Sequence, residues 1–296
     1  MNLRRTRLTV LGLVALPLTL AGCTQPAPPT QSEESVVRIT SADDPVLRAM
    51  ARVYADQLEA RGFKAKLVAE PSKPYALLEA GDADVVIGTA ETALQLVPDP
   101  KSVTGEDGVL STGELAGLAQ ALKTQGRRAA DPTAGDAGPV LVASKATMAQ
   151  YSFGSLDDLA STCKDLVFLT PSEQREDLEA WAKEAKCTPK AIKVVAAAAA
   201  MDSLRSANGQ LAVLDGDDAA IVDEGFNVLP GSEDFFDRAP ILPVVSDEVS
   251  EQALRSINDI SSSVSQDALT AVNRMVYEPG GLTSEDIAAH WEQLVN

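Results

Sequence analysis

Residues 78–87 read Leu-Glu-Ala-Gly-Asp-Ala-Asp-Val-Val-Ile, and residues 204–214 read Leu-Arg-Ser-Ala-Asn-Gly-Gln-Leu-Ala-Val-Leu. Each stretch has the end of a helix, a glycine turn and a short apolar strand, since glycine readily ends a helix. Each strand then runs into a small polar turn, at 88–92 and 215–218. This repetition predicts two similar α/β lobes that place ligand-binding turns at the carboxyl ends of strands. The alternative is that helix, glycine and strand are simply common neighbours in α/β proteins.

Strands and helices alternate along the rest of the chain. Asp44 as N-cap and Pro45 as first residue begin a helix, which Gly62 ends. Residues 127–138 read as a loop, and the chain from 246 onward as helices with a capping box at Thr283. We predict strands at 36–40, 64–69, 83–88, 140–144, 165–169, 192–195, 211–214, 226–229 and 241–245, and helices at 74–80, 112–122 and 172–185. The alternation predicts an α/β fold with mostly parallel sheets.

The N-terminus has the features of a secretory signal. Basic residues at 4, 5 and 7 precede an apolar run over 8–20, which is too short for a resident membrane span. Leu20-Ala21-Gly22-Cys23 resembles the bacterial lipobox, whose cysteine becomes the lipidated first residue of the mature chain. We therefore expect a signal peptide over 1–22, lipid on Cys23 and a Pro-rich tether over 23–35. The alternative is an ordinary soluble secretory signal with Cys23 there by chance.

The chain is strongly acidic. It carries 43 acidic and 25 basic residues, and loss of the three signal-peptide arginines leaves a net charge of −21. Such a charge argues against binding to nucleic acid or to anionic lipid surfaces, and weakly favours cationic or neutral ligands.

Two cysteines follow the signal, Cys163 and Cys187. Outside the reducing cytoplasm a disulfide between them is the expected state, with two free buried thiols as the alternative. The single histidine, His290, has no cysteine spacing that suits zinc, so no metal site is expected.

Several stretches carry a family resemblance when they are taken in order. They are 39–45 (Ile-Thr-Ser-Ala-Asp-Asp-Pro), 77–94, the cysteine pair, 218–229 with Asp-Ala-Ala-Ile and Gly-Phe-Asn-Val-Leu, and 242–245 (Leu-Pro-Val-Val). From about Val37 to its C-terminus the chain resembles the substrate-binding lipoproteins of ABC importers. The group it resembles most is the glycine betaine/carnitine/choline-binding (OpuAC-like) family.

The resemblance implies a bilobed, type II periplasmic-binding-protein-like fold. Two mostly parallel sheets flanked by helices would be joined by two hinge crossings, near 139–142 and 240–245. Lobe I would comprise 36–138 plus 245–296, and lobe II 139–244. Proteins of this kind close their lobes on a solute and then dock on a membrane permease. The resemblance also implies a monomer that needs no cofactor.

The expected ligand site departs from the family. Quaternary ammonium ligands are held there by aromatic rings, through cation–π attraction. Here 88–91 read Gly-Thr-Ala-Glu where the family has a tyrosine, and 215–217 read Asp-Gly-Asp where Phe-Thr-Thr is frequent. The candidate ligand-binding residues are instead hydroxyl and acidic side chains: Ser41, Asp43, Asp44, Thr89, Glu91, Thr92, Asp215, Asp217 and Asp218. They suit a cationic or hydroxyl-rich solute, unless Asp44 is only an N-cap and the aspartates at 217 and 218 only begin a helix.

The leading functional prediction is a solute-binding lipoprotein on the outer face of the cell membrane. It would capture a small polar solute, of the osmoprotectant type or another cationic or hydroxylated molecule, for an ABC importer. The alternative is an envelope lipoprotein that uses the same fold to bind a protein or a cell-wall component without transport. An enzyme is not expected, because the sequence has no Gly-x-Ser-x-Gly elbow, P-loop or dinucleotide fingerprint.

Overall fold

The structure is a computed structural model that describes residues 36–69, 72–105, 108–206, 210–232 and 235–295. The predicted signal peptide, the lipid site at Cys23 and the tether lie outside the described residues, as does the turn glycine at 209. Within the described ranges, no helix combines the length and the apolar character that crossing a bilayer requires.

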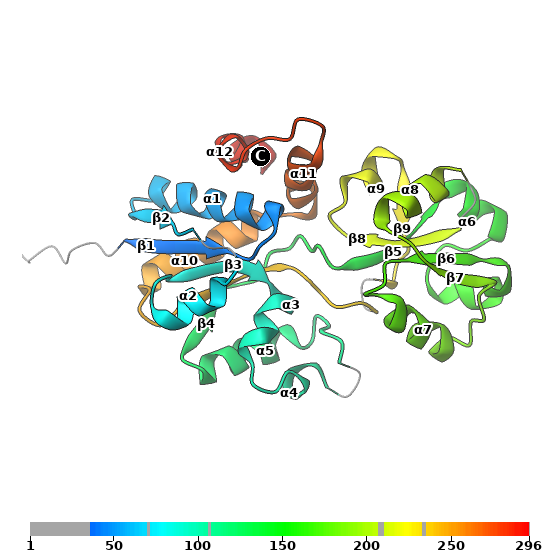
Figure 1. Cartoon of the computed structure of the whole chain (residues 1–296), viewed down its shortest axis with the longest axis horizontal. Helices are drawn as coiled ribbons and strands as arrows, with labels where there is room; N and C mark the ends of the chain where they lie inside the picture. Colours follow the sequence, from blue (N-terminus) through cyan, green and yellow to red (C-terminus); the bar gives the residue numbers. More distant parts are fainter. Residues whose placement is uncertain (1–35, 70–71, 106–107, 207–209, 233–234, 296) are drawn as a thin grey trace, which may run out of the picture. The chain divides into compact units, whose positions relative to one another are not determined.

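The first sheet has the strand order β2-β1-β3-β10-β4. Figure 1 labels β1, β2, β3 and β4 of this sheet. Its strands are β2 (Ala65–Leu67), β1 (Val37–Ser41), β3 (Val85–Thr89), β10 (Ile241–Ser246) and β4 (Arg127–Ala129). β1 pairs in parallel with β2 and β3, whereas β10 pairs antiparallel with β3 and β4. A strand from late in the chain thus completes a sheet begun at the start of the domain.

The second sheet has the order β7-β6-β8-β5-β9. Its strands are β7 (Ala191–Val194), β6 (Val167–Thr170), β8 (Leu211–Asp215), β5 (Pro139–Ser144) and β9 (Phe226–Val228). β6 pairs in parallel with β7 and β8, whereas β5 pairs antiparallel with β8 and β9.

The two sheets have the same plan, position by position. β3 and β8, the strands of the two similar sequence stretches, each lie between a parallel neighbour and an antiparallel one. The repetition in the sequence therefore reflects a structural equivalence. The sheets are mixed rather than mostly parallel, because β10 and β5 enter antiparallel from the crossing segments.

Helices cover both faces of the first sheet. On one face lies α1 (Pro45–Ala60), whose N-cap Asp44 accepts a hydrogen bond from the Leu47 amide at 2.9 Å, as the Asp-Pro start predicts. The buried side of α1, with Met50 and Val53, packs in one core with α10 (Glu251–Ser263), α11 (Gln266–Tyr277) and α12 (Ser284–Ala289). The opposite face is covered by α2 (Pro74–Ala80), α3 (Ala90–Ala93) and α5 (Leu115–Thr124).

The second sheet has its own two cores. One includes Phe168 and Trp181, with ring centroids 5.8 Å apart, and the other includes Leu204 and Ile221. The helices that pack on this sheet are α6 (Lys145–Tyr151), α7 (Arg175–Glu184), α8 (Ala197–Arg205) and α9 (Ala219–Asp223). The short helices α4 (Lys101–Thr104) and α13 (Trp291–Leu294) belong to the cores of the first sheet. Each sheet is thus enclosed by its own helices, as an α/β layer requires.

One predicted loop is partly a strand. Arg127–Ala129 forms β4 and pairs antiparallel with β10, with Val244 opposite Ala129. The prediction of a loop from 127 to 138 was wrong at this end, because pairing with a distant strand decides the conformation of so short and charged a segment. The predicted capping box at Thr283 is confirmed, with Asp286 as its partner.

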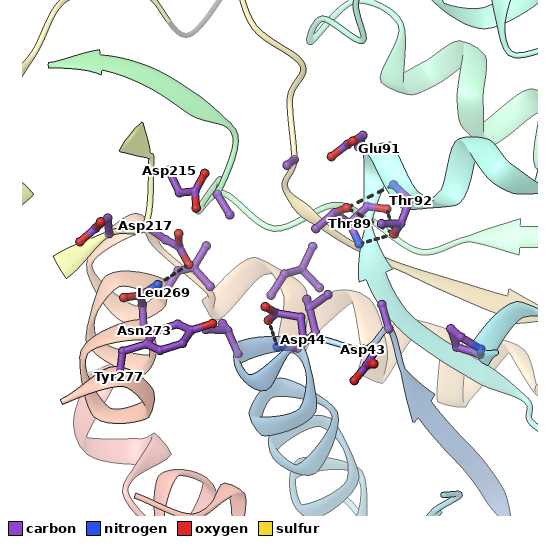
Figure 2. Close-up of a pocket in the computed structure, with 18 of the residues that line it drawn as sticks. Asp43, Asp44, Thr89, Glu91, Thr92, Asp215, Asp217, Leu269, Asn273 and Tyr277 are labelled. Carbon is purple, nitrogen blue, oxygen red and sulfur yellow. Dashed lines mark hydrogen bonds between the residues drawn. The ribbon is translucent and has the colours of Figure 1, made fainter. Parts of the chain in front are cut away.

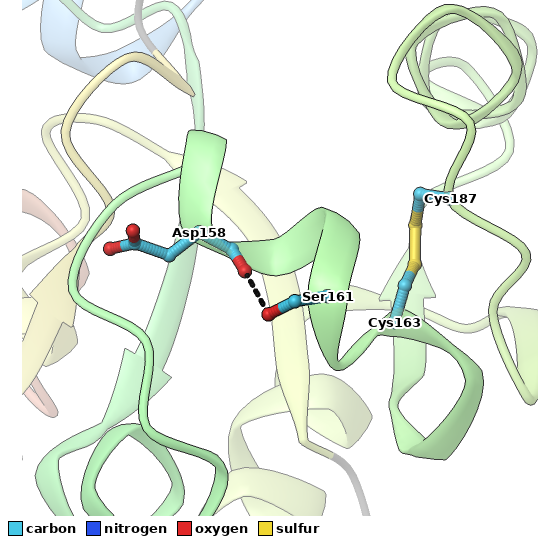
Figure 3. The surroundings of a disulfide bond; sticks show 4 residues. All are labelled: Asp158, Ser161, Cys163 and Cys187. Carbon is cyan, nitrogen blue, oxygen red and sulfur yellow. Dashed lines mark hydrogen bonds between the residues drawn. A yellow bond between two sulfur atoms is a disulfide. The ribbon is translucent and has the colours of Figure 1, made fainter.

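A disulfide joins Cys163 and Cys187, as the sequence predicts, with their Cα atoms 5.4 Å apart (Figure 3). Cys163 begins a short 3₁₀ turn, and Cys187 follows α7. Both side chains are buried in the core of the second sheet that includes Trp181. The bond therefore fastens α7 to the segment that precedes β6.

Candidate solute site

A cavity of about 780 Å³ lies where elements of both sheets meet, within the range typical of small-molecule sites (Figure 2). Its walls include the carboxyl ends of β3 and β8, residues near the starts of α1 and α3, and the N-cap residue of α9, Asp218. The lining residues are Ala42, Asp43, Asp44, Val46, Leu47, Ser72, Pro74, Tyr75, Thr89, Glu91, Thr92, Gln95, Ala137, Met201, Asp215, Asp217, Asp218, Ala239, Ile241, Leu269, Asn273 and Tyr277. The cavity thus occupies the place where open α/β folds bind ligands.

The start of α1 contributes two aspartates to the cavity. Asp43 forms an ion pair with Arg48 at 2.7 Å, so its charge is balanced within the protein. Asp44 uses Oδ1 to cap α1, and its other oxygen has no hydrogen-bond partner in the described part of the chain. Asp44 therefore both caps α1 and lines the cavity.

The turn after β3 is held in shape by a capping box. The Thr92 amide donates to Thr89 Oγ1 at 3.2 Å, and the Thr89 amide donates to Thr92 Oγ1 at 3.0 Å. The Tyr75 hydroxyl shares a hydrogen bond with Thr92 Oγ1 at 3.1 Å and packs where a side chain at Gly88 would otherwise lie. These bonds fix the turn that carries Glu91, whose side chain lines the cavity. The Glu91 carboxylate has no hydrogen-bond partner among the described residues.

The turn after β8 contributes three aspartates around one glycine. A side chain at Gly216 would lie 2.9 Å from the carbonyl oxygens of Asp136 and Gly138, so this close approach requires glycine. Asp218 caps α9 by accepting from the Ala220 amide at 2.9 Å. Asp215 ends β8, lies exposed in the cavity and, like Glu91, accepts no hydrogen bond from the part of the chain that is described.

Asp217 is the most buried acid of the cavity, with 5% of its surface exposed. Its Oδ2 accepts a hydrogen bond from Asn273 Nδ2 at 3.2 Å. Burial, together with the charges of Asp215 and Asp44, raises the pKa of Asp217 to about 7, although the bond from Asn273 opposes this shift. The group therefore changes its charge near neutral pH.

The charges of the other acids also act on one another across the cavity. Desolvation, followed by the charges of Asp237 and Asp215, raises the pKa of Glu91. Desolvation, followed by the charges of Asp218 and Asp44, raises the pKa of Asp215. Both side chains have surface open to water in the cavity, whereas Asp217 is enclosed. Acidic side chains next to strands of both sheets thus influence one another's pKa values.

Helix α11 completes the wall and links it to the turn after β8. Gln266 Nε2 donates to the Gly216 carbonyl at 3.0 Å, and Arg274 pairs with Asp223 of α9 at 2.6 Å. Asn273 and Tyr277 of α11 also line the cavity. The sequence predicted a helix here but gave no sign that it borders the site, because its partners lie about 50 residues away in the chain.

The structure brings together eight of the nine candidate residues. Ser41 is the exception: it is buried in β1 with 5% of its surface exposed and does not line the cavity. Six of the lining residues are acidic, and no lysine, arginine or histidine lines the cavity within the described part of the chain. The described residues also hold no cluster of three or more His, Cys, Asp or Glu side chains arranged for a metal ion.

Comparison with known proteins agrees with this architecture. Residues 35–293 match the model of the family described as the substrate-binding domain of ABC-type glycine betaine transport systems. The structure is similar to that of a glycine betaine/carnitine/choline ABC transporter protein, with 18% identity, a TM-score of 0.73 and coverage of 87% of this chain and 97% of that one. No curated protein matches the chain.

Two further solved structures are similar. One is apo YehZ from Escherichia coli, with 14% identity, a TM-score of 0.70 and coverage of 88% of this chain and 98% of that one. The other is lactococcal OpuAC in complex with glycine betaine, with 11% identity, a TM-score of 0.52 and the same two coverages, 88% and 98%. At these identities the likeness shows the fold alone, and it confirms the bilobed α/β class.

Proposed function

Because the chain belongs to the family of substrate-binding domains of ABC-type glycine betaine transport systems, we propose that it captures a small polar solute, cationic or hydroxylated, for an ABC importer. The observation that carries the proposal is the cavity of about 780 Å³ at the carboxyl ends of the equivalent strands β3 and β8. A solute there would contact both sheets at once. Binding would thereby favour the closed arrangement of two lobes.

The proposed lobes are 36–138 plus 245–296 and 139–244, and their crossings lead into β5 and β10. Asp136 fastens the two crossings to each other. Its Oδ1 accepts from the amides of Gly138, at 2.6 Å, and Ala239, at 3.0 Å, while its Oδ2 pairs with Arg238 Nε at 2.7 Å. These bonds hold the two crossings side by side, which would confine the bending between the proposed lobes to this place.

The proposed setting is the outer face of the cell membrane. The basic residues, the apolar run and the Leu-Ala-Gly-Cys sequence support export and lipid attachment at Cys23, and the Pro-rich segment 23–35 would act as a tether. The partners would be the solute and a membrane permease, with the protein acting as a monomer.

A second candidate is an envelope lipoprotein that binds a protein or a cell-wall component. The observation that favours it is the scarcity of aromatic rings in the cavity, where only Tyr75 and Tyr277 occur among the described lining residues. A receptor for quaternary ammonium solutes needs aromatic faces, so their loss fits a change of function as well as a change of ligand.

A thermal-shift screen of the full chain in detergent separates the two candidates. A solute at 100 times its dissociation constant adds about 2.7 kcal/mol of stability, which raises the melting temperature by several degrees. Betaines, choline, polyamines, amino acids and sugars form the panel, and at least one should stabilise the protein. Met201→Trp, which fills the cavity, should remove the shift, whereas Val222→Trp on the exposed surface should keep it. No shift with any solute would refute the transport proposal.

A further inference from the structure

We infer that the solute is an organic cation that donates hydrogen bonds through N–H groups, such as a primary ammonium, amidinium or guanidinium compound, rather than a quaternary ammonium. This inference rests on the proposed function and specifies the ligand of the same cavity. Its basis is the arrangement of charge, of unpartnered oxygens and of apolar surface around that cavity.

The cavity carries negative charge that the protein does not compensate. Of the six lining acids, only Asp43 has a basic partner, Arg48, within the described part of the chain. The Asp217 carboxylate has an amide as its partner, and Glu91 and Asp215 have none among the described residues. A cation is the complementary ligand of such a cavity, whereas a solute that carries a carboxylate adds like charge to it.

The acids that line the cavity come from both of the proposed lobes. Asp44 caps α1 and Glu91 lies in α3, and both helices pack on the first sheet. Asp215 is the last residue of β8 in the second sheet, and Asp217 follows it. The charges of these acids nevertheless act on one another. Like charges repel more strongly as they approach one another and as water is excluded between them. Bringing the lobes together over these acids would increase the repulsion, and a cation between them would remove it. The acids therefore couple closure to the presence of a cation.

The groups that line the cavity favour one kind of cation over another. The free oxygens of Glu91 and Asp215 can accept several hydrogen bonds, which a quaternary ammonium cannot donate. Its usual partners, aromatic faces, are poorly supplied: Tyr75 is 9% exposed with its hydroxyl bound to Thr92, and Tyr277 is 59% exposed at the end of α11.

The apolar part of the lining favours an organic cation over a metal ion. Val46, Leu47, Met201, Ile241 and Leu269 add apolar surface to the lining. Methylene groups between or beside the charged ends of a ligand would pack on these side chains. No metal-binding cluster occurs in the described ranges, and the volume far exceeds that of a single ion.

The test is isothermal titration calorimetry of the full chain in detergent at pH 8. Putrescine and agmatine are the N–H donors, and choline and glycine betaine are the quaternary probes. We expect putrescine or agmatine to bind at least tenfold more tightly than either quaternary compound. Glu91→Gln and Asp215→Asn each remove a charge while keeping the size of the side chain, and each should weaken that binding at least tenfold. The control is Asp165→Asn, which removes the charge of an exposed aspartate outside the lining and should leave the binding unchanged.

The outcomes separate the inference from the function on which it rests. Tighter binding of choline or glycine betaine, or binding of an uncharged sugar alone, overturns the inference and leaves a solute receptor. Binding of putrescine that is unchanged by both variants also overturns it, because the cation then lies elsewhere. If neither these four probes nor any sugar or amino acid of the thermal-shift panel binds, the proposed function fails as well.

Discussion

Replacing Asp217 by asparagine should stabilise the protein at alkaline pH. The carboxyl is enclosed, and its pKa is raised from 3.8 to about 7 by burial and by the charges of Asp215 and Asp44. In the unfolded chain the group ionises near 3.8, whereas in the folded protein it keeps its proton up to about pH 7. Stability from this group is therefore lost as the pH rises between these values, and above pH 7 the full penalty of the buried charge remains.

The magnitude follows from the shift. Each unit of pKa corresponds to about 1.4 kcal/mol, so the ionised Asp217 costs up to about 4 kcal/mol above pH 7. At pH 5 the cost is about 1.6 kcal/mol, because the folded group is still protonated. Asparagine keeps an oxygen that can accept the bond from Asn273 and carries no charge. The stability gained by Asp217→Asn should thus grow by up to about 3 kcal/mol between pH 5 and pH 8.

Urea denaturation followed by circular dichroism measures this gain. The free energy of unfolding of the wild type and of Asp217→Asn is compared at both pH values, so that effects common to the two proteins cancel. Asp165→Asn is the matched control, because it removes the same charge from an exposed position, and its difference from the wild type should stay within about 0.5 kcal/mol. A gain for Asp217→Asn that is the same at pH 5 and pH 8 would refute the reasoning.

Three further predictions concern other parts of the chain. Asn273→Ala removes the donor to the Asp217 carboxylate and should lower the free energy of unfolding at pH 8 by about 1–3 kcal/mol; an unchanged urea midpoint would show that the bond is unimportant. Cys187→Ala opens a disulfide between residues separated by 24 positions and should cost about 3 kcal/mol, and a melting temperature equal to that of the wild type would contradict this. Cys23→Ala should move the protein from the membrane to the soluble fraction, and retention in the membrane would count against lipid anchoring.

The fold could be predicted because its signals are local and repeated. The helix, glycine and strand at 78–87 and at 204–214 correspond to strands β3 and β8, which hold equivalent places in the two sheets. The start of α1 was also predictable, since an aspartate before a proline fits an N-cap and a first helical residue. The mixed pairing was not, because β10 and β5 enter their sheets from crossings that join distant segments.

The site could be predicted only where it coincides with those turns. Eight candidate residues line the cavity because they lie at or just after the carboxyl ends of strands, which the sequence pattern predicts. Ser41 does not line the cavity, because it is the last residue of β1 and its side chain is buried there. Asn273 and Tyr277 were missed because helical periodicity identifies a helix without identifying the neighbours of its polar face.

The two interpretations that the sequence left open for the aspartates are compatible. Asp44 and Asp218 each cap a helix with one carboxylate oxygen and lie in the cavity, so the same side chain can hold the helix and face a ligand. Peptide dipoles place partial positive charge at the first turn of a helix, which favours an acid there even when other acids are near. The capping geometry therefore helps to maintain a concentration of negative charge that would otherwise oppose folding. Asparagine at either position would keep the cap and remove the charge, which makes the structural and the electrostatic roles separable in the same cavity.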